Sequence, residues 1–224
     1  MMTRERTQRF ARAEHVTDTA VHAVGVMAAL AAVPVLISMS VTHRGGSGVT
    51  AAVAVYGVSL LAMLVSSAIY NVTGPHRFSH IFKRMDHTAI FLKIAGTFTP
   101  LVVMTGGAGA VYLSAIWAVA LGGSSLKILA PDSLRWLGLT LYLGLGWLGV
   151  IFGQDIFAAM TPGAVQAVTL GGLIYTAGVA FFLWERLPFH TAIWHLFVLV
   201  ATGFLYAAMY IQIAAVPERM FIVG

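Results

Sequence analysis

The chain has 224 residues, of which 59% are hydrophobic and only 9% are charged. A soluble domain carries about 25% charged residues, so this composition excludes a water-facing globular surface and indicates a surface that faces lipid. The net charge is +5 and there is no cysteine, which excludes disulfides and thiolate metal sites.

The chain opens with a cluster of basic residues. Four of its thirteen lysines and arginines lie in the first twelve positions, as Arg4, Arg6, Arg9 and Arg12. A short basic arm directly before an apolar run is typical of a cytoplasmic anchor near anionic lipid. We therefore expect membrane lipid, and no nucleic acid, as the partner. The apolar run over residues 20–40 exceeds the length of a signal-peptide core, about 7–15 residues, and predicts an uncleaved first span.

Seven apolar stretches follow one another, each long enough to cross the hydrocarbon core of a bilayer. They cover approximately residues 19–41, 49–71, 86–105, 108–129, 133–153, 164–184 and 190–216. The sequence thus predicts an all-α fold, an integral membrane bundle of seven helices. We expect a basic arm at residues 1–17, one domain over residues 18–216 and a short tail over residues 217–224.

The basic residues also predict the orientation, because they concentrate in cytoplasmic loops. With the N-terminus inside, two basic residues fall in outer segments, Arg44 and Arg219, and Lys93 lies within a span. The other ten fall in inner segments, as Arg4, Arg6, Arg9, Arg12, Arg77, Lys83, Arg84, Lys127, Arg135 and Arg186. We therefore expect a cytoplasmic N-terminus, an external C-terminus and a place in the inner (plasma) membrane.

Ionisable side chains inside a membrane are costly and are functional candidates by default. Glu14, Asp18 and His22 follow one another at intervals of four and form one stripe on the first helix. The topology brings this stripe to the same cytoplasmic level as polar residues of three other helices, namely Ser67, Asn71, Asp86, Lys93, His190, Thr191 and His195. This predicts a polar site or a polar plug in the cytoplasmic half of the bundle. The plainer alternative is that Glu14 and Asp18 only offset a helix dipole.

Several blocks of the sequence resemble the hemolysin III family. They are residues 67–71 (SAIYN), 85–90 (MDHTAI), 94–100 (IAGTFTP), 141–147 (LYLGLGW) and 193–199 (IWHLFVL). The family is the bacterial branch of the progestin and adipoQ receptor group, which includes the adiponectin receptors. The resemblance covers nearly the whole chain and implies seven spans with the N-terminus inside. It also implies a zinc site near the cytoplasmic face that suits hydrolysis of an amide in a lipid.

The resemblance implies catalytic roles for Ser67 and Asp86, and a zinc ion held by histidines of the second and seventh helices. At those three ligand positions this sequence has Asn71, Thr191 and His195. Asparagine and threonine are poor zinc ligands beside imidazole. We therefore expect zinc to be weakly bound or absent, with His195 and the neighbouring His190 as the remaining metal ligands.

Lys93 stands where the family block has an apolar residue. It follows Asp86 by about 10.5 Å along the helix axis, and its side chain leans back toward the helix start. Our hypothesis is that its ammonium group replaces the missing metal charge and keeps Asp86 ionised. The alternative is a lysine that contacts backbone carbonyls or lines a water-filled cavity.

Three functions remain open from the sequence. The first is membrane-lipid homeostasis or lipid sensing through the polar site without turnover, which the incomplete ligand set favours. The second is a zinc-dependent, ceramidase-like hydrolase of a lipid amide that uses Asp86, His195 and His190. The third is a channel or transporter, because an intramembrane cluster of aspartate, lysine and histidine is compatible with proton coupling.

Overall fold

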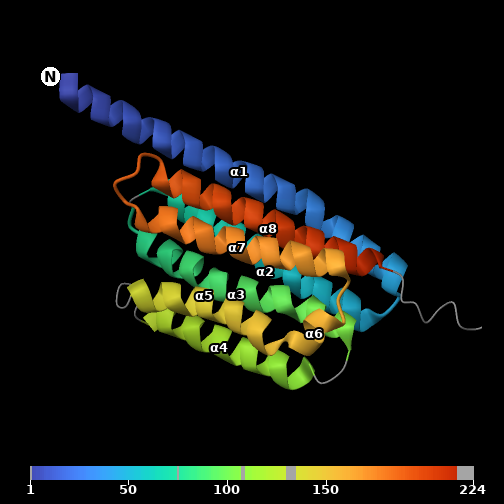
Figure 1. The fold of residues 1–224 in the computed structure, drawn as a ribbon. Coiled ribbons are helices and arrows are strands. Elements are labelled where there is room, and N and C mark those ends of the chain that lie inside the picture. Colours follow the sequence, from blue (N-terminus) through green and yellow to red (C-terminus); the bar gives the residue numbers. More distant parts are fainter. Residues whose placement is uncertain (1, 75, 107–108, 130–134, 216–224) are drawn as a thin grey trace, which may run out of the picture.

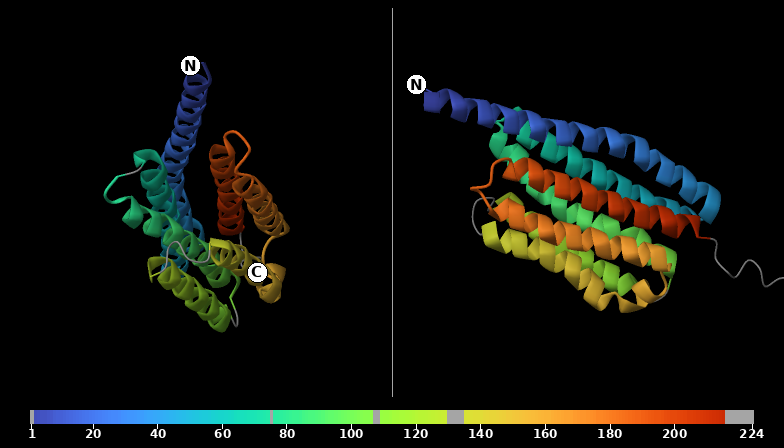
Figure 2. Two further views of the ribbon diagram at one scale, coloured as in Figure 1. Left: turned by 90° about the vertical axis from the view of Figure 1, so that its left-hand side faces the viewer. Right: turned by 45° about the horizontal axis from the view of Figure 1, so that its top comes forward.

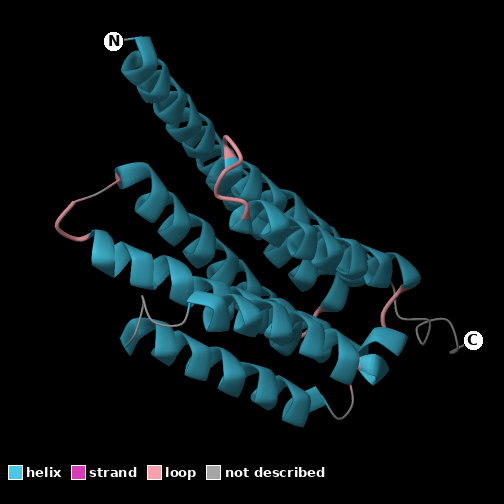
Figure 3. Cartoon of the chain, turned by 60° about the vertical axis from the view of Figure 1, so that its left-hand side comes forward, coloured by secondary structure: helices cyan, strands magenta, loops and turns pink. Residues whose placement is uncertain are grey.

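The structure, a computed structural model, describes residues 2–74, 76–106, 109–129 and 135–215. Within these ranges it contains α-helices and short loops and no β-strand (Figure 3). In chain order the helices are α1 (Met2–Arg44), α2 (Ser47–Thr73), α3 (Ser79–Thr105), α4 (Gly109–Leu129), α5 (Arg135–Phe152), α6 (Gln154–Ala158), α7 (Pro162–Leu183) and α8 (His190–Ala214). The tail predicted over residues 217–224 lies outside the described residues.

Six helices are long and apolar enough to cross a membrane, namely α1, α2, α3, α4, α7 and α8. The described apolar part of α5, Gly138–Phe152, is shorter. The five-residue helix α6 was not predicted, because it follows directly on the fifth apolar stretch and is too short to show an apolar period of its own. The all-helical, multi-pass character is thus confirmed, whereas the seventh span and the orientation remain predictions.

The predicted basic arm is helical and continuous with the first span. Helix α1 begins at Met2 and ends at Arg44, whereas the apolar pattern predicts a span over residues 19–41. The N-terminal part of α1 projects past the other helices, as Figures 1 and 2 show. Because the helix is continuous, Glu14, Asp18 and His22 keep the common face that their spacing predicts.

The long helices form a ring in which α3 lies innermost. Neighbours in sequence pack side by side from α1 to α5, α7 packs on α8, and α8 closes the ring against α1 (Figure 1). Helix α3 also contacts α5 and α8, and it is the most deeply buried of the span candidates. Helices α4 and α5 lie on the side of the bundle opposite α1, and α5 touches α7 only sparsely.

Glycines set the spacing between the first three helices. A Cβ atom on Gly57 of α2 would lie 2.4 Å from the side chain of Val33 on α1. A Cβ atom on Gly96 of α3 would lie 2.1 Å from Ser59 Oγ on α2. Small residues at such positions let the backbones of membrane helices approach closely, so α2 can pack tightly against both neighbours.

Two apolar clusters fix the orientation of α3. Leu101 of α3 is buried with Tyr56 in the larger cluster, which joins α1, α2, α3 and α8. Phe91, on another face of α3, is fully buried in a second cluster with residues of α4 and α5. Because α3 is held from two sides, the directions in which Asp86 and Lys93 leave this helix are fixed as well.

Candidate functional site

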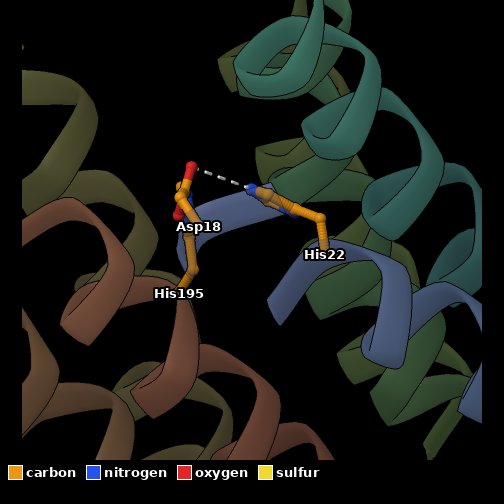
Figure 4. A group of neighbouring side chains, drawn as sticks. All are labelled: Asp18, His22 and His195. Carbon is orange, nitrogen blue, oxygen red and sulfur yellow. Dashed lines mark hydrogen bonds and ion pairs between the residues drawn. The ribbon is translucent and has the colours of Figure 1, made fainter. Parts of the chain in front are cut away.

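Asp18, His22 and His195 form a buried carboxylate and imidazole cluster (Figure 4). Asp18 and His22 lie one turn apart on α1, where they are 6% and 5% exposed, and His195 lies in the second turn of α8. One ligand atom from each of the three residues lies within 4.8 Å of the others. Helical spacing brings the first two together, and the packing of α1 on α8 adds the third.

Asp18 contacts both imidazoles, but at different distances. His195 Nδ1 lies 2.6 Å from Asp18 Oδ1, so the two groups share a short hydrogen bond. His22 Nε2 lies 3.6 Å from Asp18 Oδ2, too far for a hydrogen bond. This buried nitrogen has no hydrogen-bond partner among the described residues. Since buried polar atoms normally have a partner, His22 Nε2 is an available ligand atom.

Asp86 and Ser67, the predicted catalytic residues, lie beside this cluster. Asp86 is 9% exposed near the start of α3, and its carboxylate accepts a hydrogen bond from the Ser67 hydroxyl. One turn after Ser67, the amide Nδ2 of Asn71 donates to the Ser67 carbonyl oxygen at 2.9 Å. All three residues line one cavity together with His22 and His195.

Three further predicted residues stay at the edge of the site. Glu14 lies one turn before Asp18 on α1, is partly exposed, and does not join the metal-binding group. Thr191 lines the cavity one turn before His195. His190 lies outside the group, and its Nε2 atom is 3.5 Å from Thr191 Oγ1. The irregular, left-handed backbone at residue 189, just before α8, therefore does not turn His190 into the cluster.

Lys93 has a different partner from the predicted one. It is 2% exposed, and its Nζ donates to the Tyr175 hydroxyl of α7 at 3.1 Å. That hydroxyl shares a hydrogen bond of 2.7 Å with Thr202 Oγ1 of α8. Within the described residues no carboxylate pairs with Lys93, so the predicted pairing with Asp86 is wrong. The side chain reaches across the bundle instead of back along its own helix.

Tyr175 and Thr202 were not predicted as site residues from the sequence. The available signal was their position, since both place a hydroxyl group in the middle of an apolar span. Hydroxyl groups in spans are common in helix packing, so this signal alone does not separate a site residue from a packing residue.

A cavity of about 630 Å³ adjoins these polar groups. Most of its wall is apolar and comes from α2, α3, α5, α7 and α8. The polar side chains in the wall include His22, Ser67, Asn71, Asp86, Lys93, Tyr175, Thr191 and His195. Ligand sites typically occupy about 300–1,000 Å³ and combine an apolar lining with a few placed polar groups. The cavity therefore suits a ligand that is mostly hydrocarbon and carries a polar group.

Fold and site define a multi-pass α-helical membrane protein with a buried Asp-His-His cluster beside a ligand-sized cavity. Residues 10–206 match the family model of haemolysin-III-related proteins, and this range includes all three residues of the cluster. The chain therefore belongs to the haemolysin III family, as its sequence blocks predicted.

Similar proteins come from bacteria and from animals. The hemolysin-3 homolog of Bacillus subtilis (strain 168) is 30% identical over 206 residues, which cover 91% of this chain and 96% of that protein. Hemolysin-3 of Bacillus cereus is 34% identical over 196 residues, covering 86% and 89%. The monocyte to macrophage differentiation factor of Homo sapiens is 26% identical over 207 residues, covering 88% and 83%.

Proposed function

We propose that this protein binds a membrane lipid in its cavity and hydrolyses an amide bond of that lipid with a zinc ion held by Asp18, His22 and His195. The observation that carries the proposal is the meeting of these three side chains beside a mostly apolar cavity. We place the site in the cytoplasmic half of a seven-span bundle in the inner (plasma) membrane. The distribution of basic residues supports this orientation.

The residues present fit a zinc ion. Two imidazoles and one carboxylate form a ligand set of catalytic zinc sites, which keep a further position for water or substrate. The buried His22 Nε2, which has no hydrogen-bond partner among the described residues, supports the same assignment. The zinc positions implied by the family resemblance fit less well, because Asn71 and Thr191 stand there. Asp18 and His22 supply the missing ligands, which supports a site shifted from α2 to α1.

The chemistry that zinc supplies in such a site is Lewis-acid polarisation of a carbonyl group and activation of water. The remaining work falls to the side chains around it. Asp86 accepts a proton from the attacking water and returns it to the leaving nitrogen, as a general base and acid. Ser67 orients the Asp86 carboxylate through its hydrogen bond. The apolar wall holds the acyl chain and keeps bulk water away from the amide.

Metal analysis of the purified protein tests the zinc site. We expect about one zinc ion per chain, as in sites with three protein ligands. This zinc should be lost in His22→Ala and in His195→Ala. The matched control is His190→Ala, which removes a nearby imidazole outside the cluster and should keep the metal. Zinc that persists in His22→Ala would contradict the site.

Hydrolysis is tested separately in proteoliposomes with an N-acyl sphingosine that carries a fluorescent acyl chain. The wild-type protein should release the fluorescent acid. Asp86→Asn should retain its zinc and lose turnover, because the amide side chain cannot take up the proton. Full turnover in Asp86→Asn would exclude the role proposed for this carboxylate.

Lipid sensing without turnover is the second candidate, and the hydrogen bond between Asp18 and His195 favours it. At 2.6 Å this contact gives both groups a partner without a metal, so it can hold α1 against α8 around a bound lipid. Wild-type protein that carries lipid, contains no metal and leaves the fluorescent probe intact would support this function over hydrolysis.

A further inference from the structure

Lys93 belongs to a second polar layer that lies deeper in the bundle than the Asp18 cluster. Lys93 follows Asp86 by seven residues on α3, and Thr202 follows His195 by seven residues on α8. The two helices run in the same direction (Figure 1). A rise of 1.5 Å per residue places Lys93 and Thr202 about 10 Å further along the bundle than Asp86 and His195.

The Lys93 ammonium group has hydrogen-bonding capacity to spare. It carries three N–H donors, and within the described residues the Tyr175 hydroxyl is its hydrogen-bond acceptor. Nζ also lies 4.8 Å from the centroid of the Tyr175 ring. Neither contact supplies a negative charge, and a buried charge without a counter-charge is strongly unfavourable. The position therefore favours an anion from outside the chain.

The described wall of the cavity around this lysine is poor in carboxylates. Among the described residues, this wall contains three lysines, Lys83, Lys93 and Lys127, and one carboxylate, Asp86. Lys83 and Lys127 each have an interaction of their own. An anionic ligand fits such a wall better than a neutral or cationic one.

We infer that Lys93, positioned by Tyr175 and Thr202, binds the carboxylate of a single-chain lipid whose hydrocarbon lies along the apolar wall. One ammonium group matches one negative charge, and its remaining donors can serve the two carboxylate oxygens. A phosphate monoester would bring a charge of about −1.5 to −2 to the same single cation. The size of the cavity suits one chain rather than the two chains of a phospholipid.

The site is tested by comparing two probes with the same chain, palmitate and 1-hexadecanol. Their dissociation constants are measured by calorimetry on protein in phosphatidylcholine nanodiscs, in a mildly alkaline buffer that contains a metal chelator. We expect the wild-type protein to prefer palmitate by about tenfold or more. Lys93→Met should lose this preference and keep its affinity for the alcohol, whereas Lys93→Arg should keep the preference.

Two further variants separate the lysine from other effects. Tyr175→Phe removes the hydroxyl that positions the ammonium group, and it should weaken palmitate binding several-fold without changing alcohol binding. Arg12→Gln removes an equal charge from an exposed position and should behave as the wild type. Because the measurement excludes metal, the preference does not depend on a zinc ion, so a failed zinc site and a failed lysine site are distinguishable.

Three results would overturn the inference. The first is equal affinity of the wild-type protein for palmitate and 1-hexadecanol. The second is an unchanged preference in Lys93→Met. The third is tighter binding of hexadecyl phosphate than of palmitate, which would show that the anion is not a carboxylate. If Lys93→Met does not fold, Tyr175→Phe decides, and a wild-type affinity for palmitate there counts against the site.

Discussion

Asp18 Oδ1 and His195 Nδ1 lie 2.6 Å apart, although 177 positions separate the two residues in the chain. Their contact joins α1 to α8 and so closes the ring of helices. The same contact builds the candidate metal site, because it brings His195 to the stripe on α1. The pair therefore contributes to both the architecture and the site.

Replacing Asp18 should destabilise the protein. Asp18→Ala leaves His195 without its partner, and the loss of a buried hydrogen bond to a charged group is worth about 1–3 kcal/mol. Asp18→Asn retains one acceptor oxygen and should recover part of the loss. Unfolding titrations in mixed micelles measure the effect. Glu14→Ala, one turn earlier on the same face, is the control, and an equal loss there would contradict the importance of the contact.

Restoring the family's zinc ligands should strengthen metal binding. Asn71 and Thr191 line the cavity together with His195. Asn71→His combined with Thr191→His therefore places three imidazoles in the cavity wall. We expect zinc affinity to rise by about tenfold or more, equivalent to about 1.4 kcal/mol, because imidazole is a better zinc ligand than the amide and hydroxyl groups now at these positions. Competition with a chromogenic chelator measures this affinity.

In that double variant zinc should also survive Asp18→Ala, whereas in the wild-type background the same substitution should release it. If the double variant binds zinc no better than the wild type, the two positions lie too far from His195 to form a site.

The close approach of α2 and α3 predicts a steric effect at Gly96. A Cβ atom there would lie 2.1 Å from Ser59 Oγ, so Gly96→Ala should force the helices apart and destabilise the protein by about 1–3 kcal/mol, the usual range for overpacking. Gly122→Ala on α4 is the matched control, because no heavy atom lies within 4 Å of its added Cβ. That variant should keep or slightly raise the stability. Thermal unfolding of the two variants measures the effect, and an equal stability of Gly96→Ala and Gly122→Ala would contradict it.

At the other end of the bundle, Arg44 fastens the end of α1 to the end of α8. Its Nε donates to the carbonyl oxygen of Ile213 at 3.1 Å, and its Nη2 donates to that of Gln212. The last carbonyls of a helix have no partner within the helix, so Arg44→Ala should lower the stability by about 1–3 kcal/mol. The exposed Arg12 offers the control, since Arg12→Ala should change the stability by less than about 0.5 kcal/mol. Unfolding midpoints of both variants are the measurement.

The stripe on α1 was predictable, because residues four apart must share a helix face. The rotation of α1 against α8 was not, since it depends on packing such as that of Gly25 on α1 against Leu199 on α8. For this reason the sequence identified Asp18 and His22 as polar site residues but not as partners of His195. Lys93 shows the same limit. The helical rise fixes its position along the bundle, but its long side chain can either follow α3 or cross to Tyr175 on α7.

The closure of α1 on α8 also bears on how the protein is made. Helix α1 leaves the ribosome before α8, so Asp18 and His22 remain without His195 until the intervening helices and the start of α8 have been made. During that interval a carboxylate and an imidazole lack the partner that makes their burial in a bilayer tolerable. Chains that stop before α8 would keep this polar stripe uncovered, so synthesis of α8 becomes a condition for a stably inserted first helix.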